Sequence, residues 1–203
     1  MPLLSNLRNN PVATIQNSFI YVDTSPMGRN NGGHVLITET DHTIYSYFRI
    51  QPAIVSRDFY FPFLARNVGD IRNVRPINGP IVVTPGMNGC ALEVCYSNGC
   101  YNFFHDADGK YMSTVRNPGT RVCRIEANAY WDSRYTISDN YLGYATPAVH
   151  FICVYKNGFW HVGAFGFRSK FNQTGEDEIH GTFPPACGRY VGYFNDTIHL
   201  IKR

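Results

Sequence analysis

Two Asn-Gly pairs constrain the fold of this 203-residue chain more than any other feature of its sequence. Asn98-Gly99 and Asn157-Gly158 each lie between two runs that are rich in β-branched and aromatic residues. Asn and Gly both tolerate positive φ, which a two-residue type I′ turn requires at its central positions. The sequence therefore predicts two tight antiparallel hairpins, one around each pair.

Short strand-like segments recur along the whole chain and are separated by Gly, Pro, Asn and Asp. The expected strands cover residues 18–23, 34–40, 43–50, 58–65, 79–84, 90–97, 100–107, 121–131, 148–155, 159–167, 189–194 and 197–202. Helical periodicity is weak, and short helices are expected only near the N-terminus and over residues 126–134. We therefore predict an α+β fold, a β-dominated sandwich of mixed sheets flanked by a few helices, as one domain over residues 1–203.

The composition excludes several classes of protein. Hydrophobic residues make up 44% of the chain and charged residues 16%, which indicates a folded protein. The net charge of +3 comes from scattered basic residues, so we expect no nucleic-acid binding. The rather basic segment 57–75 is interpreted as a solvated face or loop. No run of about 18 apolar residues exists, so no membrane span is expected.

The N-terminal residues contain no continuous apolar segment, so we expect no cleavable signal peptide. The six cysteines are then expected to be free thiols in a reducing compartment. A protein exported by a dedicated bacterial machine would also lack such a signal, and that route stays open.

Cysteine and histidine recur at intervals of five in the stretch from Val82 to Gly109. The four residues are Cys90, Cys95, Cys100 and His105. A two-residue loop at Asn98-Gly99 would pair Ser97 with Cys100, Cys95 with Asn102, Leu92 with His105, and Cys90 with Ala107. Side chains alternate between the two faces of a strand. Cys90 and His105 would then share one apolar face, with Cα atoms about 7–8 Å apart, while Cys95 and Cys100 point the other way.

This alternation argues against two of the simpler roles for the four residues. A zinc site would need ligands from both faces of one hairpin, so no metal is expected. A Cys95–Cys100 disulfide is geometrically conceivable but is disfavoured in a reducing compartment.

Cys90 has two remaining interpretations. It is either a buried core thiol, since free cysteine packs like a small hydrophobe, or a nucleophile activated by His105. Three features favour catalysis, and the first is the position of the pair at the open end of the hairpin, where a substrate would have access. Gly89, with Pro85 and Gly86 upstream, lets the backbone bend sharply and aim amides at an oxyanion. Thr84, six residues before the cysteine, offers a hydroxyl that could orient the histidine.

This arrangement resembles the cysteine deamidases that convert protein glutamine to glutamate. They include the catalytic domain of the cytotoxic necrotizing factors, the Burkholderia lethal factor and the chemoreceptor deamidase CheD. The toxins carry Leu-Ser-Gly-Cys where this chain reads Met87-Asn88-Gly89-Cys90. The resemblance covers residues 84–108, and it also implies a β-sandwich flanked by helices.

The resemblance implies a cofactor-free hydrolase with a thioester intermediate. Cys90 would be the nucleophile, His105 the base and Thr84 the residue that orients it. Main-chain amides of Asn88, Gly89 and Cys90 would hold the oxyanion. Such a toxin or effector would be made in a bacterial cytoplasm and act in the host cytosol. Its partner would be a glutamine-bearing host protein, such as a small GTPase or a translation-initiation helicase, and neither nucleic acid nor membrane.

Three other functions remain open at this point. A cysteine protease or a transglutaminase would use the same Cys–His pair. A non-catalytic β-sandwich binding module would instead have an inert Cys90.

The remaining motifs carry less chemistry. Asp106 and Asp108 match only a fragment of a calcium loop, so a solvated turn is expected. His150 and His161 are interpreted as packed or surface imidazoles. Trp160 would either line a substrate groove or belong to the core.

Overall fold

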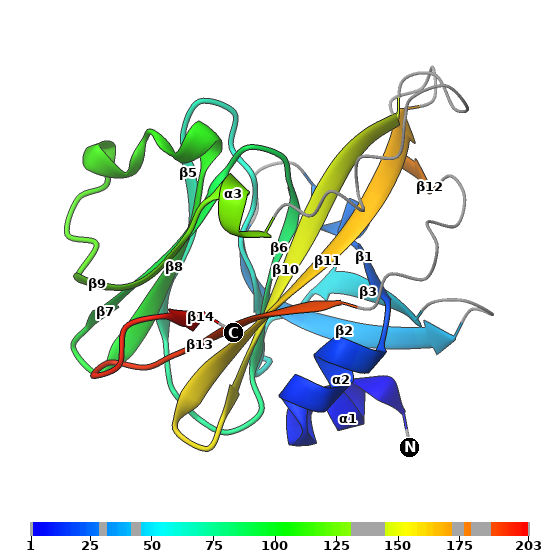
Figure 1. Cartoon of the computed structure of the whole chain (residues 1–203), viewed down its shortest axis with the longest axis horizontal. Helices are drawn as coiled ribbons and strands as arrows, with labels where there is room; N and C mark the ends of the chain where they lie inside the picture. Colours follow the sequence, from blue (N-terminus) through cyan, green and yellow to red (C-terminus); the bar gives the residue numbers. More distant parts are fainter. Residues whose placement is uncertain are drawn as a thin grey trace.

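The structure is a computed structural model that describes residues 2–28, 32–41, 46–130, 145–171, 177–179 and 188–202. These residues form the predicted sandwich of mixed sheets with few helices (Figure 1). None of the helices in the described ranges is long and apolar enough to cross a membrane.

The larger sheet has the strand order β1-β3-β2-β4-β6-β10-β11-β13-β14, with β12 paired to β11. Its strands are β1 (Ile20–Asp23), β2 (Gly33–Asp41), β3 (Ser46–Pro52), β4 (Asp58–Tyr60), β6 (Ile81–Met87), β10 (Ala145–Lys156), β11 (Phe159–Phe171), β12 (Asp177–Ile179), β13 (Arg189–Phe194) and β14 (Ile201–Lys202). The pairs β1–β3 and β4–β6 are parallel, whereas the β6–β10 and β10–β11 pairs are antiparallel. The sheet is therefore mixed, as predicted.

The smaller sheet is antiparallel and has the order β5-β8-β7-β9. Its strands are β5 (Val68–Val74), β7 (Ala91–Ser97), β8 (Cys100–Asp106) and β9 (Thr120–Ile125). The α-helices are α1 (Leu3–Asn9), α2 (Pro11–Asn17) and α3 (Ala127–Tyr130), and the 3₁₀ turns are η1 (Ser25–Met27), η2 (Ala107–Gly109) and η3 (Met112–Thr114). In Figure 1 the smaller sheet lies on the left, and α1 and α2 lie below the larger sheet.

Two hydrophobic cores lie on opposite faces of the larger sheet because its strands alternate between them. Val82 of β6 joins Leu92 and Phe103 of the smaller sheet in the first core. Val83, the next residue along β6, joins Ile15 of α2 in the second. The larger sheet is thus the middle layer between the smaller sheet and the two N-terminal helices. Burial on both faces is the reason why its strands read as apolar runs.

Both Asn-Gly hairpins form as predicted. Asn98 and Gly99 have φ of 52° and 77°, and Ser97 is paired with Cys100. Asn157 and Gly158 have φ of 52° and 86°, and the β10–β11 ladder runs from them without a shift.

The segment 57–75 departs from the prediction of a solvated face or loop. It contains strands β4 and β5, and β4 is the parallel neighbour of β6 in the larger sheet. β5 is an edge strand of the smaller sheet that exposes Arg72 and Asn73, so only this part retains a solvated face. A mixture of buried and exposed positions on one edge strand gives no clean alternation for the sequence to reveal.

Several further predictions are settled by burial. Trp160 and His150 are core residues, with exposed fractions of 0% and 3%. His161 is only partly buried, and its Nδ1 lies 2.9 Å from the Tyr190 hydroxyl. The predicted helix over 126–134 appears as α3, and its part beyond residue 130 lies outside the described residues.

Candidate active site

Thr84 and His105 meet across the interface of the two sheets. Thr84 belongs to β6 of the larger sheet and His105 to β8 of the smaller one, and Oγ1 of Thr84 lies 2.8 Å from Nδ1 of His105. Both side chains are 0% exposed. This contact joins two of the three residues that the sequence analysis selected, and it does so through the threonine hydroxyl. A hydroxyl at this distance holds the imidazole in one orientation.

A bulge in β6 lies directly after Thr84. Thr84 pairs with Phe151 and Met87 pairs with Val149, so β6 uses three steps where β10 uses two. The extra residue falls at Pro85-Gly86, where proline has no amide hydrogen for the ladder and glycine bends freely. The predicted bend is therefore real, and it ends the regular pairing where the chain turns toward the smaller sheet.

Burial controls the protonation of His105. Removal from water lowers its pKa from 6.5 to about 3, so the imidazole is neutral near neutral pH. Within the described part of the chain, Nε2 has no hydrogen-bond partner. When Nδ1 donates its hydrogen to the Thr84 hydroxyl, Nε2 carries the lone pair that a general base needs.

Phe63 covers one side of this imidazole. Its ring centroid lies 5.2 Å from that of His105, and the side chain is 42% exposed. Phe63 follows β4, which runs parallel to β6, so the carboxyl ends of both strands point toward the site. The sequence analysis missed Phe63 because its own segment was expected to be one continuous strand; the signal was Pro62, which ends such a run.

Cys90 lies just before β7, in the short connection from β6 of one sheet to β7 of the other. Its side chain is 4% exposed and belongs to the first core together with Leu92 and Val94, as the alternation predicted. Gly89 has φ of 83°, a conformation that favours glycine. The hairpin ladder ends at Ala91–Asp106. The predicted Cys90–Ala107 pair is therefore wrong, because residue 107 already begins η2.

The electrostatic environment of Cys90 keeps its thiol protonated at rest. Burial raises the thiol pKa, main-chain hydrogen bonds of Asp108 and Asn88 oppose that shift, and the carboxylates of Asp108 and Asp106 add to it. Sγ lies 3.9 Å from the Asn88 carbonyl oxygen. The Cys90 thiol and the His105 imidazole are thus both neutral near neutral pH.

Tyr130 connects α3 to the backbone of the cysteine. Its hydroxyl donates a hydrogen bond of 3.0 Å to the Cys90 carbonyl, and the residue is 0% exposed. Sequence reasoning expected a helix here but had no signal for this contact, which joins residues 40 positions apart.

The predicted solvated turn over Asp106 and Asp108 is correct only for Asp108, which is exposed. Asp106 is 0% exposed, and its Oδ1 accepts a 2.6 Å hydrogen bond from the amide of Tyr111. Nη1 of Arg124 lies 3.7 Å from Oδ2 of Asp106 and 2.6 Å from Oε2 of Glu93. These three side chains form a charged network on the outer face of the hairpin. Segment 107–119 folds back over this face, which is why the carboxylate is buried.

Cys95 and Cys100 take no part in the arrangement around His105. They lie on the outer face of the hairpin, and the Cys95 thiol is within 4.0 Å of Glu93 instead. The cysteines of the described ranges, Cys90, Cys95, Cys100, Cys123 and Cys153, are free thiols. In the same ranges, no three His, Cys, Asp or Glu side chains are grouped closely enough to hold a metal ion. Cys187 lies outside the described residues.

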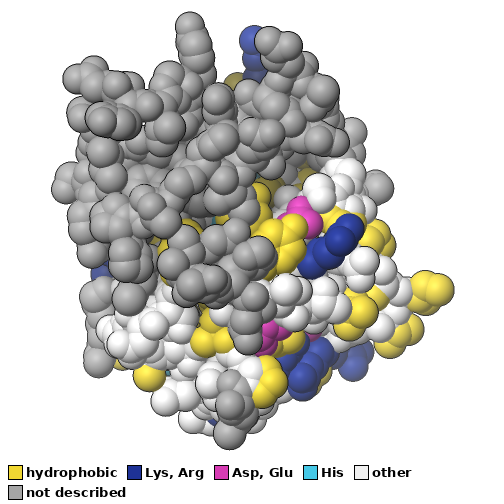
Figure 2. Space-filling view, turned by 90° about the vertical axis from the view of Figure 1, so that its right-hand side faces the viewer, with side chains coloured by type: hydrophobic (Ala, Val, Ile, Leu, Met, Phe, Trp, Pro, Cys, Tyr) yellow, Lys and Arg dark blue, Asp and Glu magenta, His cyan; other side chains and the backbone are white. Residues whose placement is uncertain are grey.

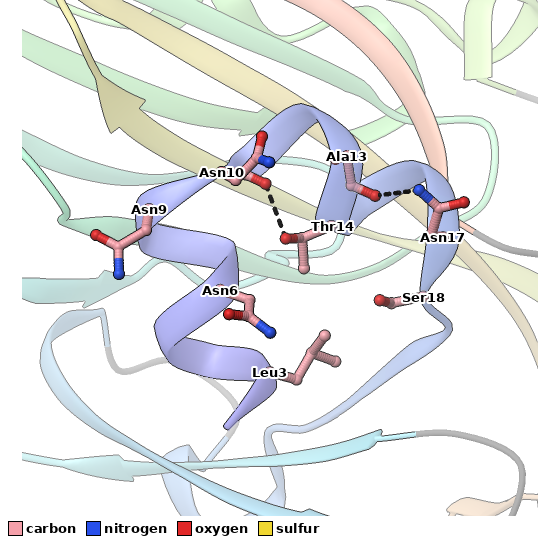
Figure 3. A pocket seen from close by; sticks show the side chains of 8 residues that line it. All are labelled: Leu3, Asn6, Asn9, Asn10, Ala13, Thr14, Asn17 and Ser18. Atoms are coloured by element: carbon pink, nitrogen blue, oxygen red, sulfur yellow. Dashed lines mark hydrogen bonds between the residues drawn. The ribbon is translucent and has the colours of Figure 1, made fainter. Parts of the chain in front are cut away.

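A separate open pocket of about 310 Å³ lies along α1 and α2 (Figure 3). It is lined by Leu3, Asn6, Asn9, Asn10, Ala13, Thr14, Asn17 and Ser18. Two of its polar groups are engaged within α2, because Thr14 donates to the Asn10 carbonyl and Asn17 to the Ala13 carbonyl. None of the lining residues is ionisable or nucleophilic enough for acyl chemistry, so the candidate active site remains the one around Cys90.

The described part of the surface in Figure 2 shows no concentrated patch of one charge. On this face the described lysine and arginine side chains are separated by hydrophobic and uncharged atoms, and acidic side chains lie among them. No family model matches this chain, and no curated protein matches it at a significant level. The function must therefore be argued from the residues around Cys90.

Proposed function

We propose that this protein is a cysteine-dependent protein-glutamine deamidase. The observation that supports it most directly is the 2.8 Å contact between Thr84 and His105, which orients a buried imidazole whose register partner, Leu92, comes two residues after Cys90. A nucleophile, a base and a group that orients the base are the three parts that acyl transfer through a thioester needs. The resemblance of residues 84–108 to glutamine deamidases selects the side-chain amide of glutamine as the substrate.

The reaction begins with transfer of the thiol proton of Cys90 to Nε2 of His105. The sulfur attacks the carboxamide carbon, and main-chain amides of Asn88, Gly89 and Cys90 stabilise the oxyanion. The tetrahedral intermediate collapses to a thioester as the imidazolium returns its proton to the departing ammonia. Water, deprotonated by Nε2, then attacks the thioester and releases glutamate and the free thiol. The net change is glutamine plus water to glutamate plus ammonia.

Burial lowers the pKa of His105 and raises the pKa of Cys90, so it opposes proton transfer between them in the resting protein, and the transfer must accompany attack on the substrate. A buried imidazolium is unstable, so the proton is passed on to the leaving group rather than retained. His105 therefore acts as a transient carrier of the proton, and no permanent thiolate–imidazolium pair is needed.

We further propose that the substrate is a protein of another cell. The family that the site resembles includes toxins and effectors that modify host proteins, among them small GTPases and a translation-initiation helicase. Synthesis in a bacterial cytoplasm and action in a host cytosol would follow. The glutamine must lie on a flexible surface loop, because the Cys90 side chain is only 4% exposed.

The test is ammonia release from a glutamine-rich unfolded protein, with mass spectrometry to locate glutamine-to-glutamate conversion. Cys90→Ser should reduce the rate to background. Cys95→Ser is the matched control, because Cys95 is 1% exposed yet lies on β7 and outside the core that Cys90 shares with Leu92 and Val94. Its activity should equal that of the wild-type protein.

Three other results would overturn the proposal. New amine termini would identify a protease, and incorporation of an added polyamine would identify a transglutaminase. If no protein of a host-cell extract changed covalently, the protein would instead be a non-catalytic binding module.

A further inference from the structure

The three proposed catalytic residues are not held in the same way. Thr84 and His105 belong to strands and are bonded to each other. Cys90 lies outside β7, after a glycine with positive φ, and Nε2 of His105 has no partner in the described part of the chain. Some other contact must fix the cysteine backbone, because a displacement of about 1 Å at a reacting atom can cost about a hundredfold in rate.

The hydroxyl of Tyr130 provides that contact. It donates to the Cys90 carbonyl at 3.0 Å from a fully buried side chain. The Tyr130 ring packs edge-on against Phe151, with centroids 5.1 Å apart and planes at 87°. Phe151 is in turn the register partner of Thr84 in the β6–β10 pair. One aromatic pair therefore connects the cysteine backbone to the strand pair that carries the threonine.

We propose that Tyr130 is a positioning residue that fixes the Cys90 backbone relative to the Thr84–His105 pair. This inference rests on the proposed function for its consequence in catalysis, but it concerns the cysteine itself. Loss of the hydroxyl leaves the Cys90 carbonyl without that donor in a dry environment. The connection then loosens, the thiol becomes more accessible to water, and the position of Sγ relative to Nε2 of His105 is no longer fixed.

The experiment compares Tyr130→Phe with Tyr101→Phe. Tyr101 is the matched control because it is 1% exposed and belongs to the same core, yet it lies at the turn end of the hairpin. We expect Tyr130→Phe to lower kcat about tenfold with KM unchanged. We also expect the pH profile of Cys90 alkylation by iodoacetamide to move down toward that of an ordinary thiol. Tyr101→Phe should change neither quantity, although it should lower the melting temperature to a similar extent.

The result that would overturn the inference is a Tyr130→Phe variant with the wild-type kcat and alkylation profile and only a lower melting temperature. The hydroxyl would then be structural alone. Failure of the proposed function looks different, because the wild-type protein itself would release no ammonia. The alkylation profile needs no protein substrate, so it reads the position of Cys90 in either case.

Discussion

The two Asn-Gly hairpins have the same kind of turn, but their buried histidines have different surroundings. Both have a two-residue turn with positive φ, and each carries a buried histidine, His105 on β8 and His150 on β10. Burial lowers the pKa of both imidazoles to about 3. The difference lies in what surrounds the rings. His105 contacts the hydroxyl of Thr84, and its register partner Leu92 comes two residues after Cys90. The His150 ring packs edge-on against that of Tyr21, with centroids 5.3 Å apart.

This comparison shows that burial and a shifted pKa do not by themselves mark a catalytic histidine. Ordinary packing perturbs a pKa as strongly as an active site does. The features specific to His105 are the Thr84 hydroxyl, which orients its ring, and a cysteine that comes two residues before its register partner Leu92. Thr84 belongs to the other sheet, and Cys90 belongs to the connection between the two sheets.

The largest expected effect separates the two histidines by activity. His105→Gln should lower ammonia release at least about a thousandfold, since it removes the general base. His150→Gln should keep the activity of the folded protein within about threefold. Rates would be measured where both variants give wild-type near-ultraviolet circular dichroism. Equal losses in the two variants would contradict the assignment of His105.

In contrast to activity, the stability of the protein in acid should depend on His105 and His150 to the same extent. Each histidine has its pKa lowered from 6.5 to about 3 in the folded protein, so the unfolded chain binds more protons between these values. Stability is therefore fully present above pH 6.5 and is lost as the pH falls toward about 3. Each histidine should account for a loss on the order of 5 kcal/mol.

Denaturant titrations at several pH values check this expectation. The free energy of unfolding should depend less steeply on acid in both His105→Gln and His150→Gln. A changed slope in only one of them would show that the two rings are not equally buried.

The Thr84 hydroxyl should have an intermediate effect. Thr84→Val keeps the shape but removes the partner of Nδ1, so kcat should fall about ten- to a hundredfold. Thr84→Ser retains a hydroxyl and should recover most of the rate. Steady-state kinetics of the two variants test this expectation, and a Thr84→Ser variant as slow as Thr84→Val would show that the hydroxyl alone does not maintain the rate and that the methyl group is also needed.

Alanine substitutions at three glycines should have the smallest effects on stability and activity. Gly89, Gly99 and Gly158 have φ of 83°, 77° and 86°, and an added Cβ at each would meet nothing within 4 Å. Alanine at each position should therefore cost only the left-handed conformation, about 1–2 kcal/mol of stability. Only Gly89→Ala should also lower kcat, because it alone strains the backbone of the nucleophile. Chemical denaturation and ammonia release measured on the same samples would test both parts.

Much of the site was predictable because it depends on local rules. The Asn-Gly turn sets the register of β7 and β8, and that register assigns Leu92 opposite His105, as observed. It also separates Cys90 from Cys95. The bend at Pro85-Gly86 was readable for the same reason, since proline cannot donate to a ladder. The burial of Asp106 was not readable, because it depends on a covering segment that carries no periodic signal.

The sequence by itself determined the two hairpins, the alternation of their faces and the choice of Cys90, His105 and Thr84 as candidates. The hairpins and their faces follow from the turn chemistry of Asn-Gly and from the two-residue period of a strand. Thr84 was chosen for its hydroxyl six residues before Cys90 and for the resemblance to cysteine deamidases. Only the tertiary structure decided that Thr84 and His105 come from different sheets, that Phe63 covers the imidazole and that Tyr130 holds the Cys90 carbonyl. Such contacts join residues far apart in the chain, and they exist only once the two sheets pack on a common core.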